Sequence, residues 1–342
     1  MTVSRASSPP WLESRIALVE RLAELLAAHQ EIVVFGHKDA DGDTLGCCLA
    51  FSEALRAQGK EVQVVVPPPW SNLYRWMPGF ERIGDQLRSD LPQPSLALFL
   101  DVGGLERAGP VAEQLLNQVT TINIDHHASN SHFGDLNLIY AEASAVGQMC
   151  LHLLQHFGWE ITPDMATNLY TAIMTDTGGF RHDNTSATTL ADASRLAELG
   201  AEPSLVAAMI YKSRPLTTIK LSGLCLSELE VEMEGRLAWA RVTKQMLRTA
   251  RATMAESEGI IDTMSSIKGL EVAIMFKEIE SELTKISVRS RQFVDAAALC
   301  ARFGGGGHIR AAGAEVKLSM SAATAAVSQA AREVIAHASC RS

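Results

Sequence analysis

The stretch Ile122-Asn123-Ile124-Asp125-His126-His127 is a short apolar run that ends abruptly in one carboxylate and two imidazoles. Two other apolar, β-prone runs end in a similar way: Glu31–Phe35 leads to His37 after one glycine, and Leu96–Leu100 leads to Asp101. Runs of this length bounded by polar residues predict buried strands. Because reactive groups collect at the carboxyl ends of the strands of a parallel sheet, we expect these side chains to converge on one metal site.

The first half of the chain alternates expected strands with expected helices. The strands are predicted over residues 31–35, 62–66, 96–100 and 121–124, and the helices over 11–29, 43–58 and 110–118. This alternation predicts an α/β fold in which helices cover both faces of a parallel sheet.

The second half begins with a helical region, after which the sequence pattern becomes typical of strands. Residues 142–224 are mostly helical by pattern, and Glu234-Gly235 is expected to turn a hairpin between strands 228–233 and 237–242. Further strands are predicted at 272–276, 285–288 and 314–317, before a final helix at 321–337. We therefore predict a metal-binding domain with a parallel sheet over residues 1–190, a helical connector over 191–225 and a smaller α/β domain over 226–342.

The composition excludes several classes of protein. The 342 residues are 47% hydrophobic and 20% charged, which is typical of a globular chain. The formal charge of −9 argues against a sequence-independent binder of long duplexes. No apolar run approaches the roughly 20 residues of a membrane span, so we expect no membrane association. The six cysteines form no CxxC pair, which favours reduced thiols and a cytoplasmic location over a zinc–thiolate site.

The segment His37-Lys38-Asp39-Ala40-Asp41-Gly42-Asp43 places three carboxylates beside an imidazole. Crowded carboxylates repel one another, and a bound metal ion relieves the repulsion. By itself, the segment is slightly more typical of a solvated turn that caps the next helix. Asp101 is explained equally well as a helix N-cap, and Asp176 is more simply a helix-end residue. Taken together, the set is rich in oxygen and imidazole and lacks thiolates, which suits two Mn²⁺ or Mg²⁺ ions roughly 3.5–4 Å apart.

A second candidate site lies near the end of the chain, where Phe303-Gly304-Gly305-Gly306-Gly307-His308 precedes Arg310. Glycines let backbone N–H groups approach a ligand closely, and successive N–H groups can form an anion nest. Residues 283–313 carry five basic side chains and one acidic side chain, a net charge of +4 in a chain of −9. A flexible glycine loop among solvated arginines is the plain alternative, but the basic cluster favours a site for phosphate or nucleotide.

These motifs resemble those of the DHH phosphoesterases, and more closely the branch that combines oligoribonuclease and pAp phosphatase activities, which is related to the RecJ exonucleases. The resemblance covers nearly the whole chain. It is carried, in the family's order, by His37-x3-Asp41-x-Asp43, by Asp101 with Arg107 after it, by Asp125-His126-His127-x-Ser129-Asn130, by Thr175-Asp176-Thr177-Gly178, by Arg289-Ser290-Arg291 and by Gly304-Gly305-Gly306-Gly307-His308. Ala40 stands where the family often has Pro, and Cys47 where it often has Ser.

The resemblance implies two divalent metal ions, Mn²⁺ by preference and Mg²⁺ as the alternative. One ion would be held by His37, Asp41 and Asp101, and the other by Asp43, Asp101, His126 and Asp176, with Asp101 bridging. The implied catalytic residues are His127 at the scissile phosphate, Asp125 orienting a histidine, and Arg107. The implied substrate contacts are Arg289, Ser290, Arg291, Gly304, Gly305, Gly306, Gly307, His308 and Arg310.

The implied function is hydrolysis of phosphoric ester bonds in short RNA or DNA oligonucleotides or pAp-type nucleotides, by a hydroxide that two metal ions activate. The same chemistry would serve a phosphodiesterase acting on cyclic or linear dinucleotides. A RecJ-like single-strand exonuclease fits less well because the chain is short and acidic, and a family II pyrophosphatase should lack the glycine–histidine run. A catalytically dead nucleotide-binding regulator would have lost ligands, and none is missing here. The sequence leaves open the preferred nucleotide, the polarity of attack and the physiological metal; a homodimer is compatible with the helical region.

Overall fold

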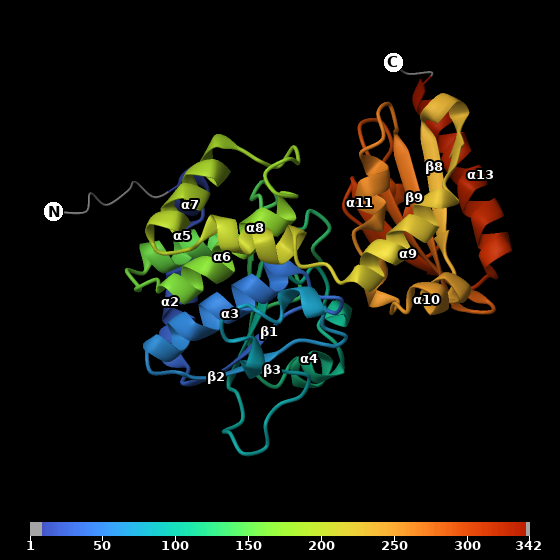
Figure 1. Ribbon diagram of the computed structural model, residues 1–342. Helices are drawn as coiled ribbons and strands as arrows, with labels where there is room; N and C mark the ends of the chain where they lie inside the picture. The colour runs from blue at the N-terminus through green and yellow to red at the C-terminus, as the bar shows by residue number, and fades with distance from the viewer. Residues whose placement is uncertain (1–8, 340–342) are drawn as a thin grey trace. The chain divides into compact units, whose positions relative to one another are not determined.

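A computed structural model describes residues 9–339, and the chain falls into two compact units, Met1–Ser213 and Arg214–Ser342 (Figure 1). Each unit has its own six-stranded sheet and its own hydrophobic core. The predicted α/β class, with a parallel sheet followed by a smaller α/β domain, is confirmed. The division between the units falls inside the expected connector, and the functional domain limits at 190 and 225 stay a prediction.

The first unit is built on a parallel sheet with the strand order β3-β2-β1-β4-β5-β6. Its strands are β1 (Glu31–Phe35), β2 (Glu61–Val65), β3 (Ile83–Gly84), β4 (Leu96–Leu100), β5 (Thr120–Asp125) and β6 (Leu136–Ile139). Successive side chains of a strand point to opposite faces. Accordingly, Ile32 and Val34 belong to a large core on one face, whereas Val33 and Phe35 belong to a smaller core on the other.

Helices bury both faces of this sheet, which explains why its strands are continuously apolar (Figure 1). On the side of the larger core lie α1 (Pro10–Glu13), α2 (Ile16–Ala28), α3 (Gly42–Ala57), α5 (Val146–His156), α6 (Pro163–Asp176), α7 (Ala187–Glu198) and α8 (Pro203–Tyr211), and α4 (Pro110–Leu115) covers the smaller core. The single helix expected over residues 11–29 is wrong, because the chain breaks between α1 and α2. At the break the Ser14 hydroxyl donates to the carbonyl oxygen of Trp11, a bond that competes with helical pairing.

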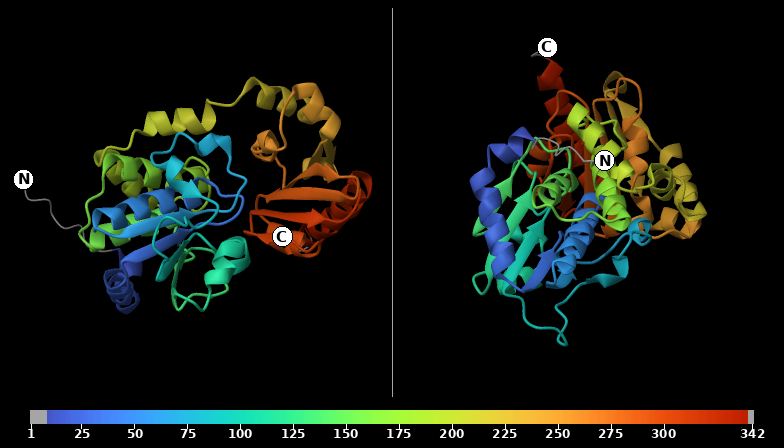
Figure 2. Two further views of the ribbon diagram at one scale, coloured as in Figure 1. Left: turned by 90° about the horizontal axis from the view of Figure 1, so that it is seen from below. Right: turned by 90° about the vertical axis from the view of Figure 1, so that its left-hand side faces the viewer.

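The second unit has a mixed sheet with the order β11-β12-β10-β9-β8-β7. Its strands are β7 (Glu230–Glu232), β8 (Leu237–Val242), β9 (Val272–Glu280), β10 (Leu283–Ser290), β11 (Gly306–Gly307) and β12 (Ala311–Val316). Only β8 and β9 pair in parallel, and the predicted hairpin is confirmed as β7–β8. Helices α12 (Ala296–Ala301) and α13 (Met320–Ser339) pack on one face, and α9 (Leu216–Ser227), α10 (Lys244–Ala250) and α11 (Ile260–Ser265) on the other. Figure 2 shows α13, in red, alongside the strands.

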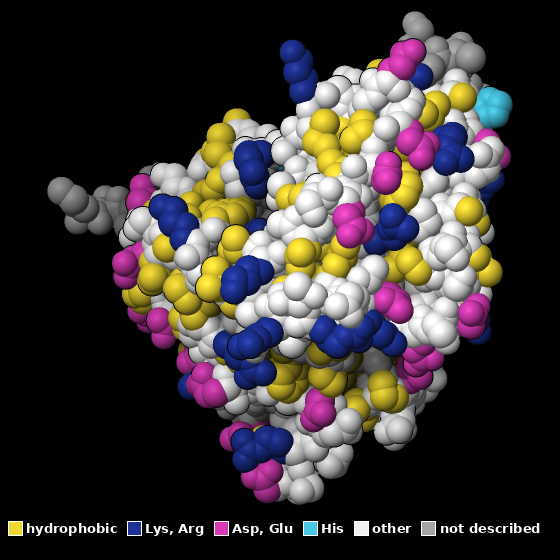
Figure 3. All heavy atoms as spheres, turned by 45° about the vertical axis from the view of Figure 1, so that its right-hand side comes forward, with side chains coloured by type: hydrophobic (Ala, Val, Ile, Leu, Met, Phe, Trp, Pro, Cys, Tyr) yellow, Lys and Arg dark blue, Asp and Glu magenta, His cyan; other side chains and the backbone are white. Residues whose placement is uncertain are grey.

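The helices, the cysteines and one face of the surface bear on the expectations from composition. None of the helices in residues 9–339 has the length and apolar character needed to cross a membrane. Cys47, Cys48, Cys150, Cys225 and Cys300 are free thiols in buried positions, and Cys340 lies outside the described residues. On the face shown in Figure 3, basic, acidic and hydrophobic side chains are interspersed.

Candidate active site

The candidate site forms where the strand order of the first sheet changes direction, between β1 and β4. Ligand sites of open α/β sheets occur at this position, at the carboxyl ends of the strands. His37 follows β1, Asp101 follows β4, and Asp125 is the last residue of β5. The Nε2 atom of His37 lies 3.4 Å from Oδ2 of Asp101, so the predicted convergence of strand ends is confirmed.

Two helices bring the remaining acidic residues to the same edge. Asp41 caps the N-terminus of α3, Asp43 lies in its first turn, and Asp176 is the last residue of α6. Helices α3 and α6 approach closely at Gly46, where a Cβ would lie 2.4 Å from the carbonyl oxygen of Asn168. A larger residue at Gly46 would therefore separate Asp43 from Asp176.

His126 lies among three of these carboxylates. Its Nε2 atom is 3.7 Å from Asp176, 3.8 Å from Asp101 and 3.9 Å from Asp43. On the other side of the ring, Nδ1 lies 3.0 Å from the carbonyl oxygen of Ala143, an acceptor that requires a proton on Nδ1. The backbone of this loop therefore selects the tautomer whose Nε2 lone pair faces the carboxylates.

His37 is oriented in the same way, because its Nδ1 lies 2.7 Å from the carbonyl oxygen of Lys38 and donates to it. The guanidinium of Arg107 lies 3.2 Å from the same Nδ1. A protonated Nδ1 cannot also accept a hydrogen bond, so in this tautomer the Arg107 contact is not one. The Nε atom of Arg107 is buried without a hydrogen-bond partner.

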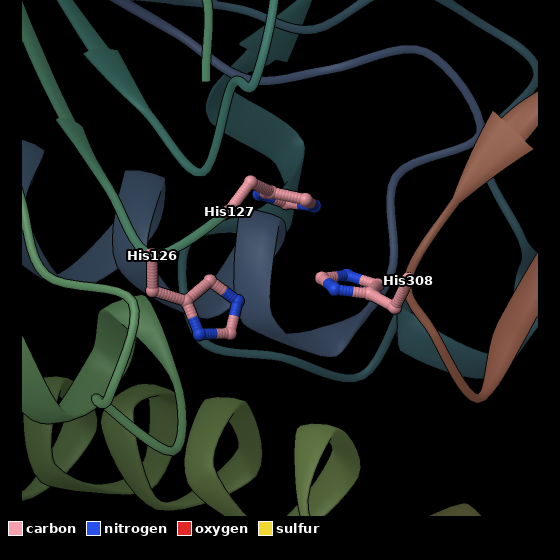
Figure 4. Close-up of side chains that lie close together, drawn as sticks. All are labelled: His126, His127 and His308. Carbon is pink, nitrogen blue, oxygen red and sulfur yellow. The ribbon is translucent and has the colours of Figure 1, made fainter. Parts of the chain in front are cut away.

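His127 has a different environment from His126, although the two are adjacent in the chain. Their rings are nearly perpendicular, with centroids 5.2 Å apart (Figure 4). The Nδ1 atom of His127 lies 2.7 Å from Oδ1 of Asp125, which is fully buried. The other carboxylate oxygen of Asp125 accepts from Asn130 at 2.5 Å. The two imidazoles thus have different partners, and the division of roles expected within Asp125-His126-His127 stays a prediction.

Burial and crowding shift the acidity of this cluster. Burial, reinforced by the nearby charge of Asp101, raises the pKa of Asp43 to about 7. Burial opposes protonation of His126, but the carboxylates of Asp176, Asp43 and Asp101 outweigh it and raise the pKa of His126 to about 10. The raised pKa values mean that bound protons offset the negative charge of the crowded carboxylates. A divalent cation would offset that charge better.

The residues present fit divalent metal ions. Among the described residues of the first unit, three groups of donor atoms lie close enough to hold an ion: His37 with Asp41 and Asp101, Asp43 with His126 and Asp176, and Asp101 with Asp125 and His127. Oδ1 of Asp101 is buried and accepts no hydrogen bond, although such an atom is normally satisfied. Carboxylates and imidazoles without thiolate suit hard or borderline ions such as Mg²⁺ or Mn²⁺.

Several supporting residues were not among the predicted site residues. The Thr44 hydroxyl donates to Oδ2 of Asp101 at 2.6 Å, and the backbone N–H groups of Val146 and Gly147 donate to the two oxygens of Asp43. The Cys47 thiol also donates to Asp43, at 3.2 Å, so it can replace the hydroxyl of the more usual Ser. Asn130 had a signal in the sequence, its spacing after Asp125, and Cys47 stood at a motif position, whereas Thr44, Val146 and Gly147 had none.

The predicted substrate residues lie together in the second unit. Arg289 and Ser290 end β10, Arg291 follows, and Gly306 and Gly307 form β11 against Ala312 and Gly313 of β12. A Cβ at Gly305 would lie 2.1 Å from the carbonyl oxygen of Gly313, so close backbone packing requires this glycine.

The backbone N–H groups of Gly304, Gly305 and His308 donate within the unit, so these three do not form the expected anion nest. Arg310 donates to the carbonyl oxygens of Val294 and Gln292. The roles of the glycine run and of Arg310 in binding substrate stay predictions.

Comparison with known proteins finds matches to both halves of the chain. Residues 31–173 match the DHH family N-terminal domain, and residues 240–337 match the DHHA1 domain. The bifunctional oligoribonuclease and PAP phosphatase NrnA of Thermus thermophilus is 33% identical over 319 residues, covering 93% of this chain and 94% of that protein. The cyclic-di-AMP phosphodiesterase PdeA of Listeria monocytogenes is 26% identical, covering 87% of this chain and 46% of its own length.

Solved structures match as well. An exopolyphosphatase-related protein from Bacteroides fragilis has a TM-score of 0.87 and 26% identity, covering 95% of this chain and 98% of that one. RecJ from Thermus thermophilus, solved with Mn²⁺, has a TM-score of 0.53 and 15% identity, covering 97% of this chain and 55% of its own. At that identity the RecJ match shows the fold alone.

Proposed function

Because the chain belongs to the DHH family, whose members hydrolyse phosphoric ester bonds, we propose that it cleaves short oligonucleotides and pAp-type nucleotides with two divalent metal ions, Mn²⁺ by preference. The observation that carries the proposal is the buried Oδ1 atom of Asp101, which accepts no hydrogen bond and lies 3.8 Å from His126 and 3.6 Å from His127. An atom of this kind suits a bridging ligand. The substrate class is supported by the T. thermophilus relative, which matches along nearly its whole length.

Each side chain has a role in this proposal. His37, Asp41 and Asp101 would hold one ion, and Asp43, Asp101, His126 and Asp176 would hold the other. When bound, two such ions lower the pKa of water and neutralise charge on the phosphate.

His127 contacts the scissile phosphate. Asp125 keeps the ring of His127 in place through Nδ1 and favours its protonated form, which suits an anionic substrate. Arg107 carries a second positive charge on the His37 side of the cluster. Arg289, Ser290, Arg291, the glycine run Gly304–Gly307 and His308 bind the remote phosphate or sugar, and such contacts orient the reacting phosphate.

A cyclic or linear dinucleotide is the second candidate substrate, because the L. monocytogenes relative is named for cyclic-di-AMP. This chain spans less than half of the L. monocytogenes relative. That likeness therefore says less about the substrate of this chain than the match to the T. thermophilus relative does.

The test is a panel of short RNAs, short DNAs, pAp, a linear dinucleotide, a cyclic dinucleotide and pyrophosphate, each assayed with Mn²⁺ and with Mg²⁺ after chelation. We expect turnover of pAp and of oligonucleotides a few residues long, and loss of turnover on chelation. Preferred turnover of the cyclic dinucleotide would select the second candidate. Tight nucleotide binding without turnover in either metal would overturn the proposal and indicate a regulator. A cytoplasmic location and a homodimer remain predictions, to be checked by fractionation and by light scattering.

A further inference from the structure

Phe293 is an exposed aromatic side chain in the second unit. Its relative accessibility is 61%, and within residues 9–339 no other Phe or Trp is exposed to a comparable extent. Exposing a ring of this size forgoes the stabilisation that burial would give. Where the backbone beneath such a ring is held in place, its exposure is a fixed feature of the fold and suggests a binding role.

The backbone around Phe293 is fixed by a buried carboxylate. Oε1 of Glu271 accepts the N–H groups of Gln292, Phe293 and Val294, at 3.1, 2.5 and 2.8 Å. Glu271 itself is only 8% exposed, so these charge-assisted bonds lie in a shielded environment. The exposure of the ring thus does not come from a loosely held loop.

The side chain of Arg310 holds the same loop by donating to carbonyl groups of the loop. The guanidinium of Arg310 donates to the carbonyl oxygens of Val294 and Gln292, at 3.2 and 2.9 Å. Both the donors and the acceptors that flank Phe293 are therefore engaged by charged side chains. Arg310 belongs to the segment that follows the glycine run, so this clamp also ties the Phe293 loop to that run.

Further bonds place the loop against the predicted substrate residues of the same unit. The N–H of Ser290 donates to the carbonyl oxygen of Arg310 at 3.0 Å, and the N–H of Ala296 to that of Ile309 at 2.7 Å. Ile309, between His308 and Arg310, is itself 59% exposed. Two exposed apolar side chains, Phe293 and Ile309, thus stand on paired segments beside Arg291 and His308.

We propose that Phe293 is a stacking platform for a nucleobase of the substrate, with Ile309 exposed on the paired segment, and that Glu271 and Arg310 are positioning residues for this platform. An aromatic face binds any base, whereas adjacent cations bind the phosphate to which the base is linked. The inference rests on the proposed function, because it assigns the base to the same substrate whose phosphate the metal site cleaves. The other occupant for such an apolar surface is a second protein chain, and the experiment below separates the two.

The test uses Phe293→Leu, which keeps an apolar side chain without a ring, and Phe293→Tyr, which keeps the ring. Val231→Ala is the matched control, because Val231 is 49% exposed on β7, the edge strand opposite β11 in the same sheet. The substrates are a dinucleotide and its counterpart with an abasic residue. Since stacking contributes about 1–3 kcal/mol per base, Phe293→Leu should lower kcat/KM for the dinucleotide about 5- to 150-fold, mainly through KM.

The abasic substrate should respond much less to Phe293→Leu, and Phe293→Tyr and Val231→Ala should stay near the wild type on both. Equal loss on both substrates would overturn the platform. So would an unchanged dinucleotide rate accompanied by a change in oligomeric state, which would assign the surface to a protein contact. Glu271→Ala should reduce the preference for the base-containing substrate, and Glu271→Gln, which keeps an acceptor oxygen, should restore part of it; a uniform loss on both substrates would make Glu271 merely structural.

A direct binding measurement keeps the inference separable from the proposed function. A 2-aminopurine nucleoside 5′-phosphate, whose fluorescence falls on stacking, should be quenched by the wild type and by Phe293→Tyr but much less by Phe293→Leu. Quenching without turnover of any substrate would refute the proposed function and leave the platform standing. Turnover with the same quenching in wild type and Phe293→Leu would refute the platform alone.

Discussion

The Nδ1 atom of His127 lies 2.7 Å from Oδ1 of Asp125, a carboxylate with no solvent-exposed surface. Asp125 is also held from the other side by Asn130. The carboxylate therefore cannot rotate away from the imidazole without losing a second hydrogen bond. This pairing sets the orientation of the histidine that we expect to meet the phosphate.

Asp125→Asn should lower kcat about 10- to 100-fold, the usual effect of removing a supporting carboxylate next to a functional histidine. The amide has nearly the same shape but does not stabilise the protonated imidazole. The measurement is steady-state kinetics on pAp, with a thermal melt to show that the variant folds. Asp90→Asn, at an exposed ion pair with Arg88, is the control and should match the wild type. Wild-type kcat in Asp125→Asn would remove Asp125 from the mechanism.

Asp101 is the residue whose replacement tests the metal site most sharply. Its φ of +61° is a left-handed conformation, which Asn tolerates better than Ala, so Asp101→Asn is the cleaner variant. We expect kcat to fall about 100- to 1,000-fold or more, because the negative charge that would bind the metal ions is lost. Asp39→Asn, at a φ of +57° and outside the proposed ligand set, is the matched control.

Thermal unfolding gives a second readout for the same pair of variants. An ion that binds only the folded chain at 100 times its Kd stabilises it by about 2.7 kcal/mol, which corresponds to a Tm increase of roughly 5–10 °C. Mn²⁺ should produce this increase in the wild type and in Asp39→Asn, and a much smaller one in Asp101→Asn. An undiminished increase in Asp101→Asn would show that Asp101 holds no ion.

In the second unit, Nε of Arg289 donates to Oδ1 of Asp262 at 3.1 Å. A substrate phosphate that binds Arg289 must compete with this carboxylate. Asp262→Asn should therefore lower KM severalfold and leave kcat unchanged. Stability should change little, because exposed ion pairs contribute about 0–1 kcal/mol. Glu333→Gln, which breaks the similar pair with Arg302, is the control. An equal fall in KM in this variant would mean that removing any one negative charge from the second unit has the same effect.

The strand ends of the first unit were predictable because each buried strand is a local run with a polar stop. The edge strands β3 and β6 were missed, since Ile83–Gly84 and Leu136–Ile139 are too short to carry a clear periodic signal. The convergence of His37 and Asp101 follows from the rule for parallel sheets. By contrast, the approach of Asp176 to Asp43 depends on the contact of α3 with α6 at Gly46, which joins residues more than a hundred positions apart. No local pattern reports such a contact, and the same holds for Thr44 with Asp101.

The pair Glu232–Arg332 makes the stability of the second unit depend on pH. Nε of Arg332 donates to Oε2 of Glu232 at 2.7 Å, and Nε1 of Trp239 donates to Oε1 at 3.1 Å. The hydrogen bond from Arg332, followed by that from Trp239, lowers the pKa of Glu232 below its ordinary value of 4.5. The unfolded chain consequently binds more protons in the interval just below pH 4.5, and stability there rises with pH.

Glu232→Gln should be less stable than the wild type near pH 7, by up to about 1 kcal/mol for a partly exposed pair. The difference should shrink as the pH falls below 4.5, because the unfolded wild type binds a proton at Glu232 there while the folded wild type still holds the ionised carboxylate. Urea unfolding at pH 7 and at pH 3.5, followed by tryptophan fluorescence, measures both values. Glu230→Gln, on the same strand β7, is the control and should show no such convergence. A stability difference that persists unchanged at pH 3.5 would mean that the contribution of Glu232 comes from packing and neutral hydrogen bonds rather than from its charge.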